Sequence, residues 1–338
     1  MKSEFRQLAM GRIAVTDGMD QNAIILLQNA GHEVVLEHYS VDELEAGALS
    51  QFDAVVIRSA TKMTKTVIKA SSGKKGNLRL IGRAGVGVDN IDMAVATKMK
   101  IAVCNTPGSS THAVVELTIG HLLACTRHIA TGDRTLRSGE WAKKQLKGTE
   151  LSGKRLGLIG FGRISQGVGQ AARALGMTLH AYDPYLPPEI AADQHCTLHE
   201  NIDDVFRLCT HISIHCNLSD ETHHLVNSER LAMMPRVGID GVNCGNHLVN
   251  CARGGIVDEE AALDALESGI LASVALDVFE VEPAGDNPLL QHRNFHGTPH
   301  IGAATLEAQA RIGQEMAALI IDFLEGRKPK SILNPEVI

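Results

Sequence analysis

Short aliphatic runs alternate with longer amphipathic stretches along most of the chain. In the first third, strand-like apolar runs occur at 12–18, 32–38, 53–59, 78–85 and 100–108. A helical stretch at 22–31 separates the first two runs, whereas the second and third are expected to be consecutive strands. Apolar strands of this kind, separated by helices, are typical of βαβ units in a parallel sheet.

A second alternating series follows a helical stretch that begins at Ser110. Residues 134–154 are basic and polar, and we expect them to wrap over the surface. The strand-like runs after them are 155–160, 177–183, 210–216, 247–254 and 270–280, with helices from 162 and at 258–269. An amphipathic helix at about 305–325 ends the pattern. The chain is therefore predicted to contain two α/β modules, the second beginning near residue 110.

The composition narrows the class of protein. The chain has 338 residues, 44% hydrophobic and 21% charged, which suits two globular domains. A net charge of −7 with no basic tail argues against nucleic acid and anionic membranes as partners. The first residues lack a signal-peptide pattern, no apolar run is long enough to span a bilayer, and the seven cysteines lack a framework spacing. We therefore expect a cytoplasmic protein with reduced thiols.

The strongest local motif follows the apolar run at 155–160. Gly160 allows a tight turn there, and Gly162 lets a pyrophosphate approach the backbone where a helix begins. Ser165 takes the third position of the G-x-G-x-x-G pattern, where a small side chain fits helix–strand packing. Asp183 ends the next run about 20 residues later, the spacing of a carboxylate that binds a ribose hydroxyl. This context predicts a dinucleotide site that favours NAD over NADP.

Seven longer motifs extend from the first module to the last helix. They are RSATKMT (58–64), IGRAGVGVDNID (81–92), NTPG (105–108), GTELSGKRLGLIGFGRI (148–164), VNCARGGIVDE (249–259), ALDVFEVEP (275–283) and TPHIGAAT (298–305). In this order they resemble the D-isomer-specific 2-hydroxyacid dehydrogenases, most closely the branch that oxidises 3-phosphoglycerate. The resemblance implies two doubly wound α/β domains with a cleft between them. These are a Rossmann-type NAD-binding domain at 110–304 and a flavodoxin-like substrate domain at 1–109 and 305–338.

The resemblance also implies a catalytic trio of Arg253, Glu282 and His300. His300 would exchange a proton with the 2-hydroxyl of the substrate, a role suited to an imidazole near neutral pH. Glu282 would bind the other ring nitrogen and stabilise the imidazolium. Arg253 would bind the substrate carboxylate through two parallel hydrogen bonds and polarise the neighbouring carbonyl.

Further binding residues follow from the same motifs. The implied NAD contacts are Val86, Gly160, Gly162, Arg163, Ile164, Asp183, Cys216, Cys251, Ala252, Arg253, Asp277, His300, Ile301, Gly302 and Ala303. The implied substrate contacts are Arg58, Ser59, Arg83 and Asn105, with Lys143 and Lys144 as further cations. We expect no metal, although His211, Ser213 and His215 share one face of a strand and invite a zinc interpretation.

The motifs leave several functions open. Oxidation of 3-phospho-D-glycerate, a step of serine biosynthesis, is the first hypothesis, and a glyoxylate, hydroxypyruvate or lactate-type reductase is the alternative. An NADH-sensing corepressor would keep the same trio. Formate dehydrogenase is disfavoured, because that branch has glutamine where Glu282 stands.

Three further expectations concern the outer parts of the molecule. Residues 236–247 are longer than the family's equivalent, and we expect an extended loop there. Residues 110–150 are expected to form the interface of a homodimer or of a dimer of dimers, as in the family. The chain stops near Ile338, so regulatory domains of the kind that follow in longer relatives are not expected.

Overall fold

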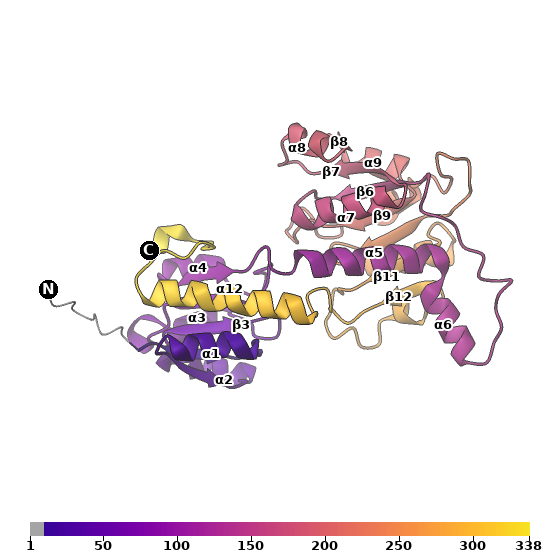
Figure 1. The fold of residues 1–338 in the computed structure, drawn as a ribbon. Helices are drawn as coiled ribbons and strands as arrows, with labels where there is room; N and C mark the ends of the chain where they lie inside the picture. The colour runs from indigo at the N-terminus through magenta and orange to yellow at the C-terminus, as the bar shows by residue number, and fades with distance from the viewer. Residues whose placement is uncertain (1–9) are drawn as a thin grey trace. The chain divides into compact units, whose positions relative to one another are not determined.

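The computed structural model describes residues 10–338, which divide into two compact units. Unit 1 comprises residues 10–110 and 303–338, and unit 2 comprises Thr111–Gly302. Each unit is built on one parallel β-sheet flanked by helices, which confirms the predicted α/β class (Figure 1).

The sheet of unit 1 has five described strands in the order β2-β1-β3-β4-β5. They are β1 (Arg12–Val15), β2 (Glu33–Leu36), β3 (Ala54–Ile57), β4 (Leu80–Arg83) and β5 (Ala102–Asn105). This order is the flavodoxin-like winding expected from the motifs. Its helices are α1 (Gln21–Asn29), α2 (Val41–Glu45), α3 (Lys65–Ser71), α4 (Met93–Lys98) and α12 (Leu306–Leu324), with 3-10 turns η1 (Ala48–Gln51), η2 (Gly73–Lys75) and η4 (Pro335–Val337).

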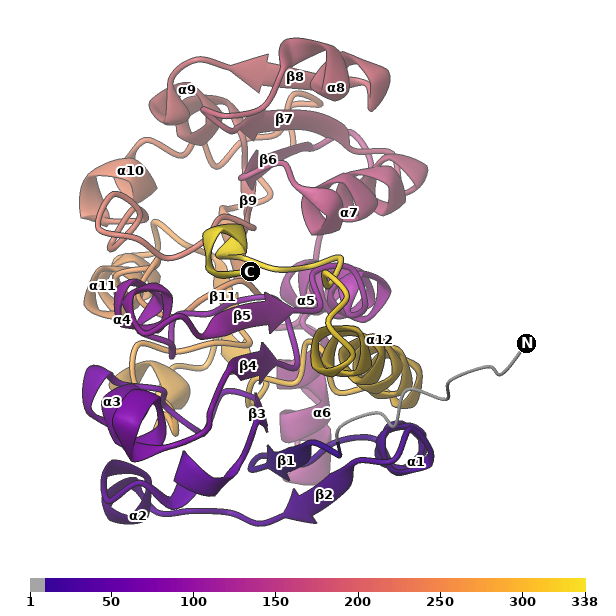
Figure 2. The same cartoon turned by 90° about the vertical axis from the view of Figure 1, so that its left-hand side faces the viewer.

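Helices cover both faces of this sheet because its strands are apolar on both faces. All four residues of β3 are buried. Val55 and Ile57 pack on the side of α3 and α4, whereas Ala54 and Val56 pack on the side of α1 and α12. Figure 2 shows the two groups of helices on opposite sides of the strands. Alternate residues of each strand therefore belong to two separate hydrophobic cores, one on each face of the sheet.

The sheet of unit 2 has seven strands in the order β12-β11-β10-β9-β6-β7-β8. They are β6 (Arg155–Ile159), β7 (Thr178–Tyr182), β8 (Cys196–His199), β9 (His211–Ile214), β10 (His247–Asn250), β11 (Ser273–Leu276) and β12 (Phe295–Gly297). The central crossing from β6 to β9 is the reversal of direction of a Rossmann-type sheet, as expected. The helices are α5 (Thr111–Arg127), α6 (Ile129–Arg137), α7 (Arg163–Ala174), α8 (Pro188–Asp193), α9 (Ile202–Leu208), α10 (Ser228–Ala232) and α11 (Glu259–Glu267), with the 3-10 turn η3 (Pro288–Gln291).

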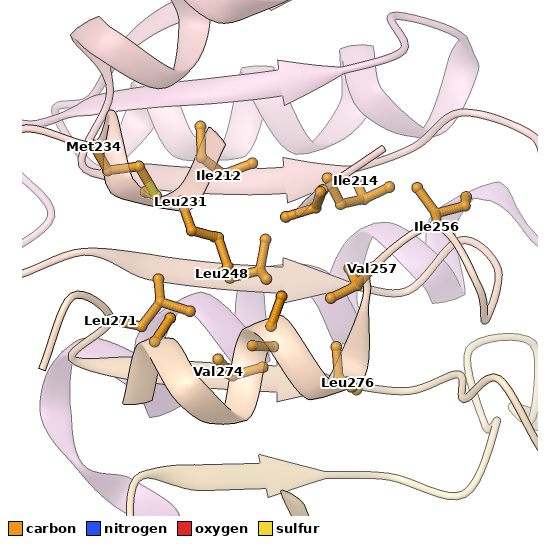
Figure 3. Packing of buried hydrophobic residues seen from close by; sticks show 14 of the residues in the cluster. Ile212, Ile214, Leu231, Met234, Leu248, Ile256, Val257, Leu271, Val274 and Leu276 are labelled. Carbon is orange, nitrogen blue, oxygen red and sulfur yellow. The ribbon is translucent and has the colours of Figure 1, made fainter. Parts of the chain in front are cut away.

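The two faces of this sheet bury separate clusters. Leu156, Leu158 and Val249 pack against α5 and α7 on one face. Ile212 and Leu248 pack against α9, α10 and α11 on the other. Figure 3 shows the second cluster, in which side chains of β9, β10 and β11 lie among Leu231, Ile256 and Val257. Burial on both sides fixes the register of the strands that carry the loops described below.

The structure corrects two sequence-based expectations and adds detail to a third. Residues 134–154 do not simply wrap the surface, because their first part continues the helix α6; His128, at φ +54°, separates that helix from α5. Residues 236–246 form a loop before β10, and an isolated antiparallel bridge between Val237 and Asn243 closes it. The expected consecutive strands 32–38 and 53–59 are separated by α2 and η1, which are too short to produce a helical period in the sequence.

Two other expectations concern cysteines and membranes. Cys125 is 1% exposed and belongs to the core of unit 2. All seven cysteines are free, and only Cys216 is not buried. Between residues 10 and 338, no helix combines the length and the hydropathy that a membrane crossing requires.

Candidate functional site

The turn after β6 has the geometry of a phosphate-binding turn. Gly160 adopts φ +84°, and a Cβ there would lie 2.8 Å from the backbone nitrogen of Cys216. Only glycine meets both conditions. A Cβ on Gly162 would meet nothing within 4 Å, so the space above the second glycine is open. Gly162 is also the N-cap residue of α7 and has no side chain that could accept a hydrogen bond. The first amides of the helix, those of Arg163 and Ile164, are therefore not capped by a side chain. The turn therefore fits a pyrophosphate.

Asp183 lies directly beside this turn. Its Oδ2 accepts a hydrogen bond from the backbone N–H of Phe161 at 2.9 Å, and its Oδ1 accepts one from Tyr185 at 3.0 Å. The two bonds fix the carboxylate at the end of β7, next to the glycine turn. The acceptor positions that remain are available to hydroxyl groups of a ribose.

Ser165 is fully buried on α7, at the third position of the glycine pattern. The small side chain is accommodated, but its Oγ has no hydrogen-bond partner among the described residues. Replacing the family's glycine therefore leaves one buried hydroxyl unsatisfied, a condition that disfavours the folded state.

His300 and Glu282 are joined by a hydrogen bond. The Nδ1 atom of His300 lies 2.8 Å from Glu282 Oε2, and each side chain is 35% exposed. Burial alone would raise the pKa of Glu282. The hydrogen bond and charge of His300, with smaller contributions from Phe279 N–H and Arg253, outweigh burial, so the pKa of Glu282 lies below its usual value. The glutamate is thus held ionised with its charge directed at the imidazole.

Arg253 follows β10 in a loop that Asn250 holds in place. Asn250 is 1% exposed; its amide donates to the carbonyl of Arg253 at 2.8 Å, and its Oδ1 accepts from Ala252 N–H at 2.9 Å. The guanidinium donates to the carbonyl of Ala252 at 2.6 Å. Because Arg253 also lowers the pKa of Glu282, the three residues of the expected trio form one electrostatic group in unit 2.

Asp277 has a role that the sequence did not reveal. It is 1% exposed, and its carboxylate accepts hydrogen bonds from Thr298 Oγ1 (2.6 Å), Ile301 N–H (2.8 Å) and Gly302 N–H (2.8 Å). Its backbone carbonyl accepts from His300 N–H at 2.8 Å. The loop that presents His300 is therefore wrapped around this one carboxylate. An acidic residue directly after an apolar strand was the available signal, but its partners are more than twenty residues away.

The remaining NAD-contact candidates of unit 2 lie at the same edge of the sheet. Cys216 follows β9 and packs under Gly160, and Cys251 and Ala252 follow β10. Burial raises the pKa of Cys216 to about 11 and that of Cys251 to about 12, so both thiols are neutral near pH 7. Neither acts as a thiolate ligand or nucleophile in this state.

In unit 1, the expected substrate residues follow neighbouring strands. Arg58 and Ser59 follow β3, Arg83 ends β4, and Asn105 ends β5 opposite Arg83 in the register. The guanidinium of Arg83 donates to Ser59 Oγ at 3.2 Å. Gly85 makes room for this guanidinium, since a Cβ at its φ of +151° would lie 1.5 Å from Arg83 Nη1.

Asn105 and Val86 are tied to each other. The Asn105 amide donates to the carbonyl of Val86 at 2.7 Å, and its Oδ1 accepts from Ser331 at 2.9 Å. These contacts give Asn105 a structural task in holding the loop after β4. Ala303, the last of the expected NAD contacts, belongs to unit 1, where its carbonyl accepts from Gln309.

The histidines of the β9 face bond to neighbouring hydroxyl groups. His215 Nε2 lies 2.9 Å from Ser213 Oγ, and His211 Nδ1 lies 2.9 Å from Thr210 Oγ1. Burial lowers the pKa of His215 to about 3, so the ring is neutral. Between residues 10 and 338, the grouping with suitable ligand atoms is His224, Asp258 and Glu280. His224 Nε2 lies 2.9 Å from Glu280 Oε1, and its Nδ1 lies 3.7 Å from Asp258 Oδ2.

The sequence and the fold both match those of known dehydrogenases. Residues 119–302 match the model of the NAD-binding domain of D-isomer-specific 2-hydroxyacid dehydrogenases. The chain is 42% identical over 96% of its length to a D-3-phosphoglycerate dehydrogenase of Methanocaldococcus jannaschii, and it spans 60% of that protein. It is 45% identical over 94% of its length to a hydroxypyruvate reductase of Thermotoga maritima, covering 99% of it. A D-lactate dehydrogenase structure from Aquifex aeolicus, complexed with NAD and lactic acid, superposes with a TM-score of 0.80 at 25% identity, over 97% of each chain.

Proposed function

Because the chain belongs to the D-isomer-specific 2-hydroxyacid dehydrogenase family, we propose that it oxidises a D-2-hydroxy acid at C2 with NAD, and reduces the 2-oxo acid in reverse. The observation that carries this proposal is the 2.8 Å bond between His300 and Glu282, in the same unit as the glycine turn. The cysteine pattern favours the cytoplasm, where the seven thiols stay reduced.

His300 acts as the acid–base group. Glu282 occupies Nδ1, so Nε2 is the nitrogen that takes the proton of the substrate hydroxyl or returns it. The ionised Glu282 stabilises the imidazolium that results, as the lowered pKa of the glutamate requires. Arg253 binds the substrate carboxylate and stabilises negative charge on the 2-oxygen. NAD, when bound, supplies the hydride acceptor.

The NAD contacts extend from the glycine turn. The amides of Arg163 and Ile164 bind the pyrophosphate and Asp183 binds the ribose. Cys216 lies on the adenosine side. The nicotinamide half is contacted by Cys251, Ala252, Asp277 and residues 300–302.

As substrate we propose 3-phosphoglycerate, and hence a step in serine biosynthesis. The support is the grouping of Arg58, Ser59 and Arg83 at one edge of the unit 1 sheet, because guanidinium groups bind phosphate through two hydrogen bonds. The name of the Methanocaldococcus relative agrees. Hydroxypyruvate is the second candidate, since the chain covers nearly the whole length of the Thermotoga reductase at higher identity.

Initial rates with purified protein separate these candidates. We expect NAD reduction with 3-phosphoglycerate to exceed that with D-glycerate or D-lactate by at least tenfold in kcat/KM. Arg83→Ala should remove this preference while leaving turnover of unphosphorylated acids. Equal rates for glycerate and its phosphate, or faster reduction of hydroxypyruvate than of phosphohydroxypyruvate, would contradict the substrate assignment. His300→Ala should abolish turnover of every acid while NADH still binds.

We also propose that the chain forms homodimers through residues 110–150. Ile129, Leu136 and Trp141 are 57%, 59% and 80% exposed, an apolar surface that a partner would cover. Light scattering after gel filtration should give twice the 36.2 kDa of the chain, and Trp141→Lys should shift the mass towards one chain. A monomeric wild type would contradict the interface.

A further inference from the structure

Polar side chains gather on one face at the amino end of the unit 2 sheet. Arg155 of β6 is in register with Thr178 of β7, and His180 of β7 is in register with Thr197 of β8. Side chains two residues apart share a face, so these four residues and His199 all point to the same side. This edge is opposite to the one that carries the glycine turn, since Arg155 begins β6 and Gly160 follows its end.

Helix α9 covers this face only in part. A Cβ on Gly157 would meet Val205 of α9 and Cys209, which shows that the helix packs directly on β6 at that point. Two residues earlier, at Arg155, a groove of about 370 Å³ opens at the amino end of the sheet. Met177 and Leu179, which belong to the cluster on the α7 side, also line it. Its polar lining comes from Arg155, Arg173, Thr178, His180, His195 and Thr197. We call it the amino-edge groove.

The charged residues that line the groove are both arginines. Its lining contains no aspartate or glutamate. Arg155 is half-buried, and its guanidinium has no hydrogen-bond or ion-pair partner within residues 10–338. The preceding residue differs: Lys154 is bound to Asp240 at 2.5 Å with 3% of its side chain exposed. Arg173 makes only a 3.4 Å contact with the carbonyl of Gln194.

The floor of the groove is formed by polar side chains. His180 Nδ1 lies 2.9 Å from His199 Nε2, so the two rings share a hydrogen bond. Burial, His199 and Arg155 together lower the pKa of His180 to about 4. His195 is held at φ +53°, a conformation that most side chains avoid and that often marks a functional position. The hydroxyls of Thr178 and Thr197 make no hydrogen bond with any described residue.

We propose that the amino-edge groove binds a small oxyanion of at least two negative charges, such as a phosphate or sulfate group, in a site separate from the dinucleotide turn. Arg155 and Arg173 supply the charge, and Thr178 and Thr197 supply hydroxyl donors. The volume leaves room for a small organic group attached to the anion. The proposal is independent of which hydroxy acid the protein oxidises.

Sulfate is the probe of choice, because its charge is constant across neutral pH. The protein is first saturated with NADH, which occupies the glycine turn, and sulfate is then titrated against chloride at matched ionic strength. Binding is followed by calorimetry and by the histidine ring NMR signals. We expect saturable shifts at His180 and His199 and none at His32 in unit 1.

Arginine variants decide whether this groove is the site. Arg155→Gln should weaken sulfate binding at least tenfold, and Arg173→Gln, on an exposed side chain that folding does not need, should weaken it several-fold. Arg207→Gln is the matched control, because this exposed arginine of α9 is paired with Asp204 and does not line the groove. Unchanged affinity in both groove variants, or ring signals that do not respond to sulfate, would overturn the proposal.

Discussion

Asp277→Asn is the most informative change outside the proposed trio. The buried carboxylate accepts three hydrogen bonds, two at Oδ1 and one at Oδ2. Asparagine keeps one oxygen, so two bonds become neutral ones and the third donor meets an amide N–H. Bonds to charged groups contribute about 1.5–3 kcal/mol and neutral ones about 1 kcal/mol, and an unsatisfied buried donor costs about 1–3 kcal/mol. The expected loss of unfolding free energy is therefore about 4 kcal/mol.

Two measurements test this figure. Urea unfolding followed by circular dichroism should give the loss of stability, and hydrogen exchange should show faster exchange of the Ile301 and Gly302 amides. Asp92→Asn is the control, because Asp92 caps α4 through Val95 N–H and asparagine caps equally well; we expect a change below about 0.5 kcal/mol. If Asp277→Asn lost less than about 1 kcal/mol with unchanged exchange at the two amides, the reasoning about the loop would be refuted.

Three further outcomes are expected. Gly85→Ala should raise the KM for 3-phosphoglycerate about tenfold in initial-rate assays, because the new methyl group displaces the guanidinium of Arg83; an unchanged KM would contradict this. Burial lowers the pKa of His121 and of His247 to about 4, so the unfolded chain binds more protons than the folded one between pH 6.5 and 4. Stability should thus be complete above pH 6.5 and fall by about 3 kcal/mol per histidine as pH drops towards 4; urea midpoints that stay constant from pH 7 to 4.5 would show otherwise. Ser165→Ala removes an unsatisfied buried hydroxyl and should raise the thermal midpoint, by about 1 kcal/mol of stability; a lower midpoint would indicate a hidden partner.

The sequence predicted those parts of the fold that depend on residues close together in the chain. The apolar runs marked the strands because parallel strands are buried on both faces, and Gly160 and Asp183 could be identified from spacing alone. The trio needed family resemblance, since an arginine, a glutamate and a histidine in three separate loops have no common period. Short elements such as α2, β8 and β12 contain too few residues to show a hydrophobic period in the sequence.

The features that the sequence did not predict depend on contacts between residues far apart in the chain. The turn at 236–247 closes because buried Asn246 accepts from Arg236 N–H and donates to the carbonyl of Ile270. Helix α6 begins where His128 takes a left-handed conformation, which no neighbouring residue signals. Asp277 was expected near the cofactor, yet its described partners all belong to the loop around His300. Such long-range partners are fixed by tertiary structure and leave no local pattern.

The close approach of Gly85 to Arg83 has a consequence for how this loop can evolve. The guanidinium occupies the space that any other residue at position 85 would need for its Cβ. A lineage that acquires a side chain at position 85 first must displace the arginine at once. A lineage that first loses the arginine can then replace the glycine. The new residue at position 85 must still adopt the positive φ of the glycine, but it meets no guanidinium. The two substitutions therefore have a preferred order, and their combined effect should be smaller than the sum of the separate ones. Reversal towards the present pair would have to restore glycine before arginine.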